Sequence, residues 1–228
     1  MTGDSPSHQL NDAEIRFLAT LLNIIKSRSW KEFEHIIISN PNAFQSFSLT
    51  ISCSTQLNGM TILHACVRSN PPTNIVRLLL ALVPESLCHV DCLHRTPLHV
   101  AVGTRADLSV IQLLADAYPA ACSVQDMDGK TPLHLACDSS CELFEGDYEK
   151  LPHDPPSIGV VFVLVRAWPW SVPLEDKDDT SALEYAILSD SSIEVVKLLQ
   201  HATRTQCEKQ TQQVMSFKTK RDESFPPL

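Results

Sequence analysis

The chain has 228 residues, of which 43% are hydrophobic and 20% are charged, and these values are ordinary for a soluble folded protein. Its formal net charge is −9 at pH 7, which argues against a general nucleic-acid-binding protein because such proteins need a basic face. The composition therefore favours a folded domain that has no nucleic-acid partner.

The cysteines and the N-terminus indicate the compartment. The 8 cysteines show no compact disulfide spacing, and we interpret Cys66 and Cys137 as small core residues in a reducing compartment. Polar and acidic residues precede any apolar segment at the N-terminus, so no signal peptide is expected. The longest apolar run, residues 160–165, is too short to span a bilayer. We expect a cytoplasmic protein with no membrane partner, and the nucleus is the alternative location.

Two helices are predicted near the N-terminus, after a disordered segment at residues 1–10. Residues 11–25 are amphipathic with an acidic first turn, and residues 30–39 give a second helix that Asn40 and Pro41 end. Residues 46–55 are expected to form a long loop. We interpret this pair as a degenerate N-terminal unit that precedes the regular pattern, because a terminal unit has one face in water.

A seven-residue segment then recurs every 35 residues. Its copies are Met60-Thr-Ile-Leu-His-Ala-Cys66, Arg95-Thr-Pro-Leu-His-Val-Ala101 and Lys130-Thr-Pro-Leu-His-Leu-Ala136. A fourth copy, Ser181-Ala-Leu-Glu-Tyr-Ala186, comes 50 residues later, so fifteen extra residues lie inside the third unit. Self-similarity at a fixed period of this size predicts a solenoid.

Each unit is predicted to contain a short helix and a longer one. Thr96 is a good N-cap, and Pro97 fits the first helical position, where its missing N–H costs nothing. The longer helix has apolar residues at i, i+1, i+3 and i+4, which form one broad buried stripe, at residues 75–80, 110–115, 160–165 and 195–200. Three of these helices end beside a proline, at Pro84, Pro119 and Pro169. A single unit cannot bury its stripe, so stacking against neighbours must do so.

The segment Asp126-Met-Asp-Gly-Lys-Thr-Pro-Leu-His-Leu-Ala136 resembles the turn and first helix of the ankyrin repeat family almost without change. The resemblance extends over about residues 12–203 and is weakest in the fourth unit, which keeps only Leu183 and Ala186. It implies an all-α ankyrin-repeat solenoid of stacked helix–turn–helix units, joined by hairpin-like loops, with degenerate terminal units. Two departures are the absence of glycine where the second helix stops and a period of 35, not 33.

The predicted organisation is one ankyrin-repeat domain over residues 11–203, followed by a polar tail at 204–228. A degenerate N-terminal unit lies at about 11–55, and the first to fourth units lie at about 56–90, 91–125, 126–175 and 176–203. The third unit contains an acidic insertion at 141–156, in which Phe144, Tyr148 and Leu151 are apolar anchors that need burial. The insertion is either a functional excursion or a tolerated surface loop.

The sequence gives little support for a catalytic site or a metal-binding site. His64, His99 and His134 recur with the period, so we expect each to hydrogen-bond the threonine three residues before it and the adjoining turn. We see no glycine-rich phosphate loop and no nucleophile beside a base, so we predict a protein that is not an enzyme and has no cofactor. The densest set of metal-ligand types is Cys88, Cys92 and His94, and a metal- or redox-sensing protein is therefore the alternative.

The resemblance implies a function in protein binding, as an adaptor or scaffold. Ankyrin repeats bind partner proteins through a concave surface formed by the hairpin tips and the exposed side of each first helix. The resemblance places the following residues on that surface: Gln56, Asn58, Met60, Arg68, Asp91, Leu93, Arg95, Thr104, Gln125, Met127, Lys130, Ser139, Asp176, Lys177 and Asp178. We expect a monomer whose partner is another protein. A regulatory ankyrin subunit of a separate enzyme is a further alternative.

Overall fold

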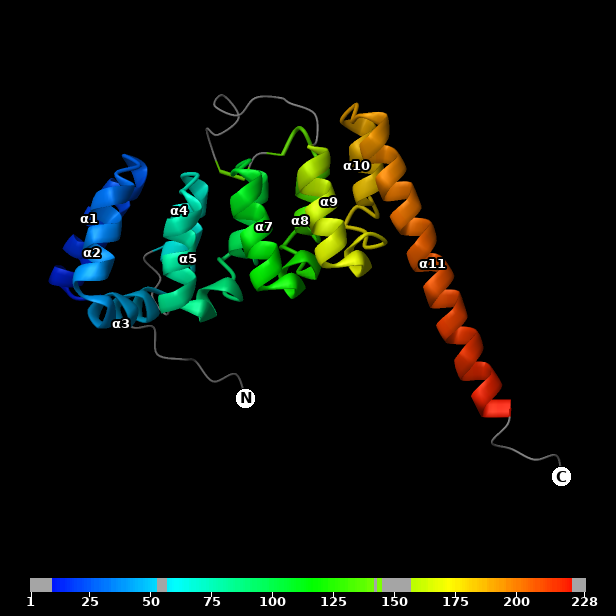
Figure 1. Cartoon of the computed structure of the whole chain (residues 1–228), viewed down its shortest axis with the longest axis horizontal. Coiled ribbons are helices and arrows are strands. Elements are labelled where there is room, and N and C mark those ends of the chain that lie inside the picture. Colours follow the sequence, from blue (N-terminus) through cyan, green and yellow to red (C-terminus); the bar gives the residue numbers. More distant parts are fainter. Residues whose placement is uncertain (1–9, 53–56, 142, 145–156, 223–228) are drawn as a thin grey trace.

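The computed structural model describes residues 10–52, 57–141, 143–144 and 157–222. In these residues the secondary structure is helical, apart from one isolated bridge between Glu175 and Ser181. The helices stand side by side in chain order and form an elongated row (Figure 1). Their bounds are α1 Asp12–Lys26, α2 Trp30–Ser39, α3 Pro41–Ser52, α4 Ile62–Arg68, α5 Thr73–Leu82, α6 Pro97–Gly103, α7 Leu108–Ala117, α8 Pro132–Cys137, α9 Ile158–Ala167, α10 Ala182–Leu188 and α11 Ile193–Asp222.

The starts of the short helices follow from their caps. The Thr96 hydroxyl accepts the backbone N–H of His99 at 3.4 Å, and the Thr96 backbone N–H donates to Nδ1 of His99 at 3.1 Å. Thr61 and His64 form the same reciprocal pair at the start of α4. Pro97 occupies the first position of α6, as predicted. Two orphan donors are thereby satisfied within one turn, which fixes where each short helix begins.

The two kinds of helix end differently. The short helices α4, α6 and α10 are followed by a residue in the left-handed region, with φ of 52° at Asn70, 55° at Arg105 and 49° at Asp190. The long helices α5, α7 and α9 stop before a proline that begins a short 3₁₀ turn, at Pro84–Leu87, Pro119–Ser123 and Pro169–Ser171. The predicted use of proline as the stop signal is confirmed.

The predicted loop at residues 46–55 is wrong for the part that the structure describes. Pro41 ends α2 but is also the first residue of α3, which continues to Ser52. Phe44, Phe47 and Ile51 recur at helical spacing along α3 and are all buried. The Phe47 ring packs edge-on to Phe17, with 4.8 Å between the centroids, so α3 packs against α1.

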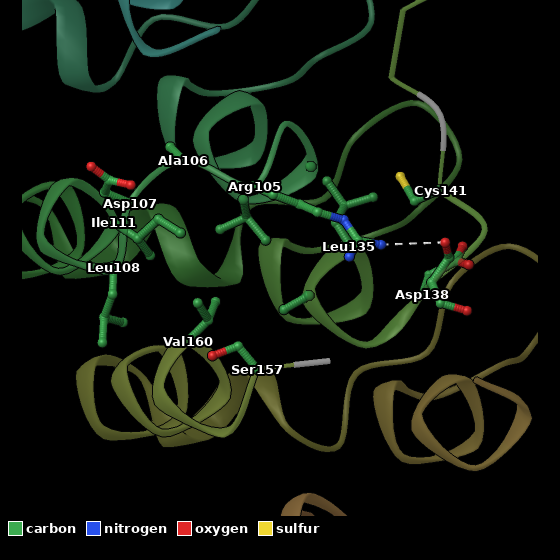
Figure 2. Close-up of a pocket in the computed structure, with 14 residues that line it drawn as sticks. Arg105, Ala106, Asp107, Leu108, Ile111, Leu135, Asp138, Cys141, Ser157 and Val160 are labelled. Carbon is green, nitrogen blue, oxygen red and sulfur yellow. Dashed lines mark hydrogen bonds between the residues drawn. The ribbon is translucent and has the colours of Figure 1, made fainter. Parts of the chain in front are cut away.

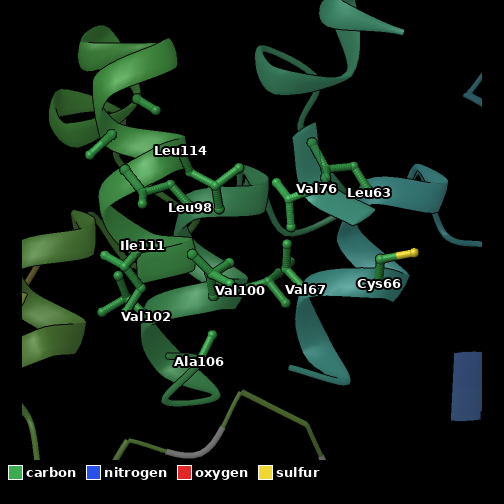
Figure 3. Close-up of a cluster of buried hydrophobic side chains, with 14 of the residues drawn as sticks. Leu63, Cys66, Val67, Val76, Leu98, Val100, Val102, Ala106, Ile111 and Leu114 are labelled. Atoms are coloured by element: carbon green, nitrogen blue, oxygen red, sulfur yellow. The ribbon is translucent and has the colours of Figure 1, made fainter. Parts of the chain in front are cut away.

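The core is continuous along the row and has no single centre. Figure 3 shows side chains of α4 and α5 meeting those of α6 and α7. Val67 of α4 and Val100 of α6 face each other there, and both are fully buried. The same relation links α6 to α8 and α7 to α9. This confirms the predicted all-α solenoid, in which each unit buries its apolar faces against its neighbours.

The last helix is the longest. Val195 and Leu199 of α11 are buried against the row, as the apolar stripe predicts. The helix then continues across residue 203 to Asp222 and projects away from the stacked units (Figure 1). The first part of the polar C-terminal segment therefore extends the last helix.

Candidate functional site

A tight turn precedes each of the last three short helices and forms a hairpin tip. In each tip one aspartate oxygen accepts two backbone N–H groups at 2.9–3.0 Å, from the residues two and four positions later. The aspartates are Asp91, Asp126 and Asp176. The residue three positions after each one has a positive φ, 60° at His94, 79° at Gly129 and 55° at Asp179. The expected role of Asp126 as a turn former is confirmed.

Backbone hydrogen bonds join each tip to the next one. Cys92 N–H donates to the Asn58 carbonyl at 2.8 Å, and Met127 N–H donates to the Leu93 carbonyl at 3.0 Å. Lys177 N–H donates to the Asp128 carbonyl at 3.0 Å. The tips therefore form one continuous row, which we call the tip row (residues 57–60, 91–95, 126–130 and 176–180).

Histidines connect each short helix to the following tip. Nε2 of His64 lies 3.0 Å from the Arg95 carbonyl, and Nε2 of His99 lies 3.2 Å from the Lys130 carbonyl. Because Nδ1 accepts a backbone N–H in both residues, Nε2 carries the proton and donates to the carbonyl. Burial lowers the pKa of both residues to about 4. The structural role expected of these two histidines is confirmed.

His134 departs from this pattern. Its Nδ1 accepts the Thr131 N–H at 3.1 Å, but its Nε2 makes no hydrogen bond within the described residues. The ring packs edge-on to Tyr185 of the fourth unit, with 6.0 Å between the centroids, and burial lowers its pKa. The contact of the third unit with the fourth is therefore aromatic at this point, where the earlier units have a hydrogen bond.

Three residues placed on the binding surface are buried. Asp91 and Arg95 form a buried ion pair, in which Nη2 lies 2.7 Å from Oδ2 and the side chains are 1% and 7% exposed. Asp176 is 7% exposed and accepts the Tyr185 hydroxyl at 2.7 Å. The expectation that these side chains face the solvent is wrong, because the turn and the neighbouring helix use their polar atoms.

The Lys130 side chain also contacts other residues of the protein and is only half-buried. Its Nζ lies 2.9 Å from Oδ2 of Asp138 and 4.5 Å from the centre of the Tyr185 ring. Burial alone lowers the pKa of Lys130, but the hydrogen bond and charge of Asp138, together with Tyr185, raise it above its usual value. Lys130 is therefore positively charged at neutral pH and is held at the junction of the third and fourth units.

The other residues of the set lie as follows. Asn58, Arg68, Leu93, Gln125, Met127, Lys177 and Asp178 are exposed, whereas Met60, Thr104 and Ser139 are half-buried. Gln125 donates to the carbonyls of Gly129 and Glu175 at 2.7 and 2.9 Å, so it helps to join two tips. Gln56 lies outside the described residues.

Two residues at the start of the insertion contact Arg68 of α4 and Arg95 of the tip that precedes α6. The Phe144 ring lies 3.7 Å from Cζ of Arg68 and 4.6 Å from Cζ of Arg95, measured to the ring centre. Nη1 of Arg95 donates to the Leu143 carbonyl at 2.7 Å. The expectation that Phe144 needs burial is met in part, since it is half-buried. Its location on this surface was not predicted, because the contact joins residues that are 48 apart in the sequence.

Comparison with known families agrees with this architecture. The model for ankyrin repeats (3 copies) matches residues 35–126. Residues 35–126 therefore contain ankyrin repeats. The segment at residues 130–136 and the fourth unit lie beyond the matched region, but they continue the ankyrin array with the same short and long helices. No curated protein matches the chain. Ankyrin repeats generally mediate protein–protein interaction.

A hollow of about 390 Å³ lies between the second and third ankyrin units. Figure 2 shows Leu108 and Ile111 at one side and Val160 at another, with Arg105 across the opening. Cys141 and Ser157, which also line it, flank residues 142–156, and most of that segment lies outside the described residues. We therefore assign no ligand to this hollow.

The cysteines that the structure describes form no assembled metal site. Cys88 Sγ donates to the Glu85 carbonyl at 3.1 Å, and His94 serves as the left-handed residue of its tip. Among the described residues, no group of three or more ligating side chains could hold a metal ion. Cys66 and Cys137 are free and buried, and burial raises the pKa of both thiols, to about 12 for Cys137. Within the described part of the chain, no helix is both long and apolar enough to cross a bilayer.

Proposed function

We propose that this ankyrin array is a non-enzymatic adaptor or scaffold that binds a partner protein through the tip row and the first-helix surface. The first-helix surface is defined by the equivalent positions of successive units, of which Arg68 and Leu188 are exposed and Gly103 and Asp138 are buried. The family supports the general role, since ankyrin repeats mediate protein–protein interaction and are typically non-enzymatic.

The exposed apolar side chains of the tip row carry the proposal. Leu93 and Met127 are 43% and 48% exposed on adjacent tips, and the backbone hydrogen bond from Met127 to Leu93 fixes their spacing. An apolar side chain held rigidly in a polar rim loses little conformational freedom on binding and gains from burial against a partner. Exposed Lys177 and Asp178 continue the row and supply charged contacts at its end.

Affinity purification from the native cell with quantitative mass spectrometry tests this surface. The tip variant is Leu93→Ser with Met127→Ser, and the control is Phe162→Ser on α9, where an apolar side chain is 52% exposed away from the tip row. We expect recovery of the partner to fall at least about tenfold with the tip variant, a loss typical of interface anchors, and to be unchanged with the control. Equal recovery with both variants would remove the tip row from the binding surface.

We also propose a monomer in the cytoplasm. The cysteines that the structure describes are free, including the exposed Cys88 and Cys92, and this supports a reducing compartment. Sedimentation of the purified chain and imaging of a tagged chain test the two parts separately. A stable dimer or an exclusively nuclear signal would contradict the corresponding part.

A further inference from the structure

The first-helix surface already holds a short peptide segment. The Phe144 ring contacts the guanidinium groups of Arg68 and Arg95, whose Cζ atoms lie 3.7 and 4.6 Å from the ring centre, well within the range of a cation–π contact. Arg95 also donates to the Leu143 carbonyl at 2.7 Å. Side chain and backbone of this pair are therefore recognised together, by residues of the first and second units.

Gly103 provides the space for Leu143. A Cβ atom added at Gly103 would overlap the Cδ1 atom of Leu143 and would lie 2.6 Å from its Cγ atom. The equivalent positions of the other units carry Arg68, Asp138 and Leu188, so only the second unit lacks a side chain here. A glycine inside a helix is unfavourable relative to alanine, and Gly103 has no positive φ that would require it. The absence of a side chain at Gly103 therefore leaves room for the Leu143 side chain.

The buried ion pair holds the site rigid. Asp91 orients Arg95 through two contacts of 2.7 and 2.8 Å, and it also accepts the Arg95 backbone N–H. The third nitrogen of this guanidinium, Nη1, is the one that reaches the Leu143 carbonyl. A preorganised donor that captures a main-chain carbonyl is suited to a peptide ligand, because every peptide offers that acceptor.

We propose that Arg68, Arg95 and Gly103 form a binding site for two successive apolar residues of a partner protein, the second of them aromatic, and that Leu143 and Phe144 are the chain's own occupant of it. This inference rests on the proposed function and names the peptide chemistry that the surface recognises. The partner segment displaces Leu143 and Phe144 when it binds. Leu143 and Phe144 are covalently linked to the site, so they compete with the partner at an effective concentration on the order of 1 mM. A partner must therefore bind the site tightly enough to displace this intramolecular competitor.

A titration with a synthetic peptide tests the site without the natural partner. The probe is acetyl-Glu-Leu-Phe-Glu-amide, the chain's own sequence at residues 142–145, with 4-fluorophenylalanine for ¹⁹F detection. The receptor is the full chain carrying Leu143→Ala and Phe144→Ala, which we call the vacated variant. We expect it to bind the probe with a dissociation constant on the order of 1 mM, and the unmodified chain to bind at least about threefold more weakly.

Two further changes in the vacated variant locate the probe. Adding Gly103→Ala fills the leucine position and should abolish binding, although the change favours the helix and so preserves the fold. Gly159→Ala in α9 is the matched control and should bind as the vacated variant does. Adding Arg68→Ala should weaken binding about three- to fivefold through loss of one cation–π contact, whereas Arg77→Ala on α5 should have no effect.

The outcomes separate the alternatives. Absence of binding to the vacated variant, or equal binding after Gly103→Ala, would overturn the site. Dimerisation of the unmodified chain that is lost in the vacated variant would assign the site to a second copy, which also contradicts the proposal. If the peptide results hold while the tip variant recovers its partner undiminished, the binding site stands and the proposed use of the tip row fails.

Discussion

Acidification should destabilise the array through His64 and His99. Both side chains are fully buried, and both donate from Nε2 to the carbonyl of the next tip while Nδ1 accepts a backbone N–H. A second proton would have to enter at Nδ1 and would break that bond. The pKa of each residue in the folded chain is about 4, below the ordinary value of 6.5. Asp91, Arg95 and His89 are the charged and titratable groups nearest His64.

The sign and size of the effect follow from proton binding. Between pH 6.5 and 4 the unfolded chain binds protons at these histidines and the folded chain does not, so the free energy of unfolding falls as the pH falls. At pH 5 a pKa difference from 6.5 to 4 corresponds to about 2 kcal/mol for each residue. Two residues give about 4 kcal/mol, a large part of the 5–15 kcal/mol that stabilises a typical domain.

Urea unfolding followed by circular dichroism at pH 8, 7, 6 and 5 measures this loss. The comparison is with His64→Gln/His99→Gln, which is less stable at every pH but lacks the two titrating groups. Carboxylates and His134 titrate in both proteins, so the difference between the two slopes isolates His64 and His99. The unmodified chain should lose about 4 kcal/mol more than the variant between pH 8 and pH 5. Parallel slopes would refute the assignment of these histidines as buried and neutral.

Two substitutions and one labelling experiment test the tip row and the core. Arg95→Ala should lower the free energy of unfolding by about 3 kcal/mol in a urea titration, because it leaves the Asp91 carboxylate buried without its partner. Gly129→Ala should cost more than about 1 kcal/mol in the same assay, since φ is 79° there and the new Cβ would lie 2.8 Å from the next tip's backbone. In mass-spectrometric mapping, exposed Cys88 should react with an alkylating reagent at once, whereas buried Cys66, whose pKa burial raises, should react only after unfolding. Smaller losses for the first two variants, or equal labelling of the two thiols, would contradict the geometry.

The parts of the fold that were predicted correctly depend on local signals. Thr96 and Pro97 begin α6, and a proline ends α5, α7 and α9, because caps and proline act within one helical turn. The hydrogen bonds of His64 and His99 were predicted from the 35-residue repeat, because an identical residue in identical surroundings makes the same contact. In α3 the helical spacing of Phe44, Phe47 and Ile51 is itself a local signal, and the predicted loop at residues 46–55 does not take it into account.

The features that were not predicted depend on contacts between distant parts of the chain. The burial of Arg95 needs both the turn at Asp91 and the approach of Leu143 from the third unit. A charged residue at a hairpin tip looks solvent-exposed when only its neighbours in sequence are considered. The contact of Phe144 with Arg68 and Arg95 likewise follows from the path that the chain takes after α8.

The histidine bonds also give the array a direction. His64 and His99 each donate forward, to a carbonyl that belongs to the following unit. Truncation after residue 90 or after residue 125 therefore removes the carbonyl that accepts from His64 or from His99, whereas removal of units from the N-terminal side only frees a carbonyl that water can satisfy. We therefore expect a chain that lacks N-terminal units to have a higher free energy of unfolding than a chain that lacks the same number of C-terminal units.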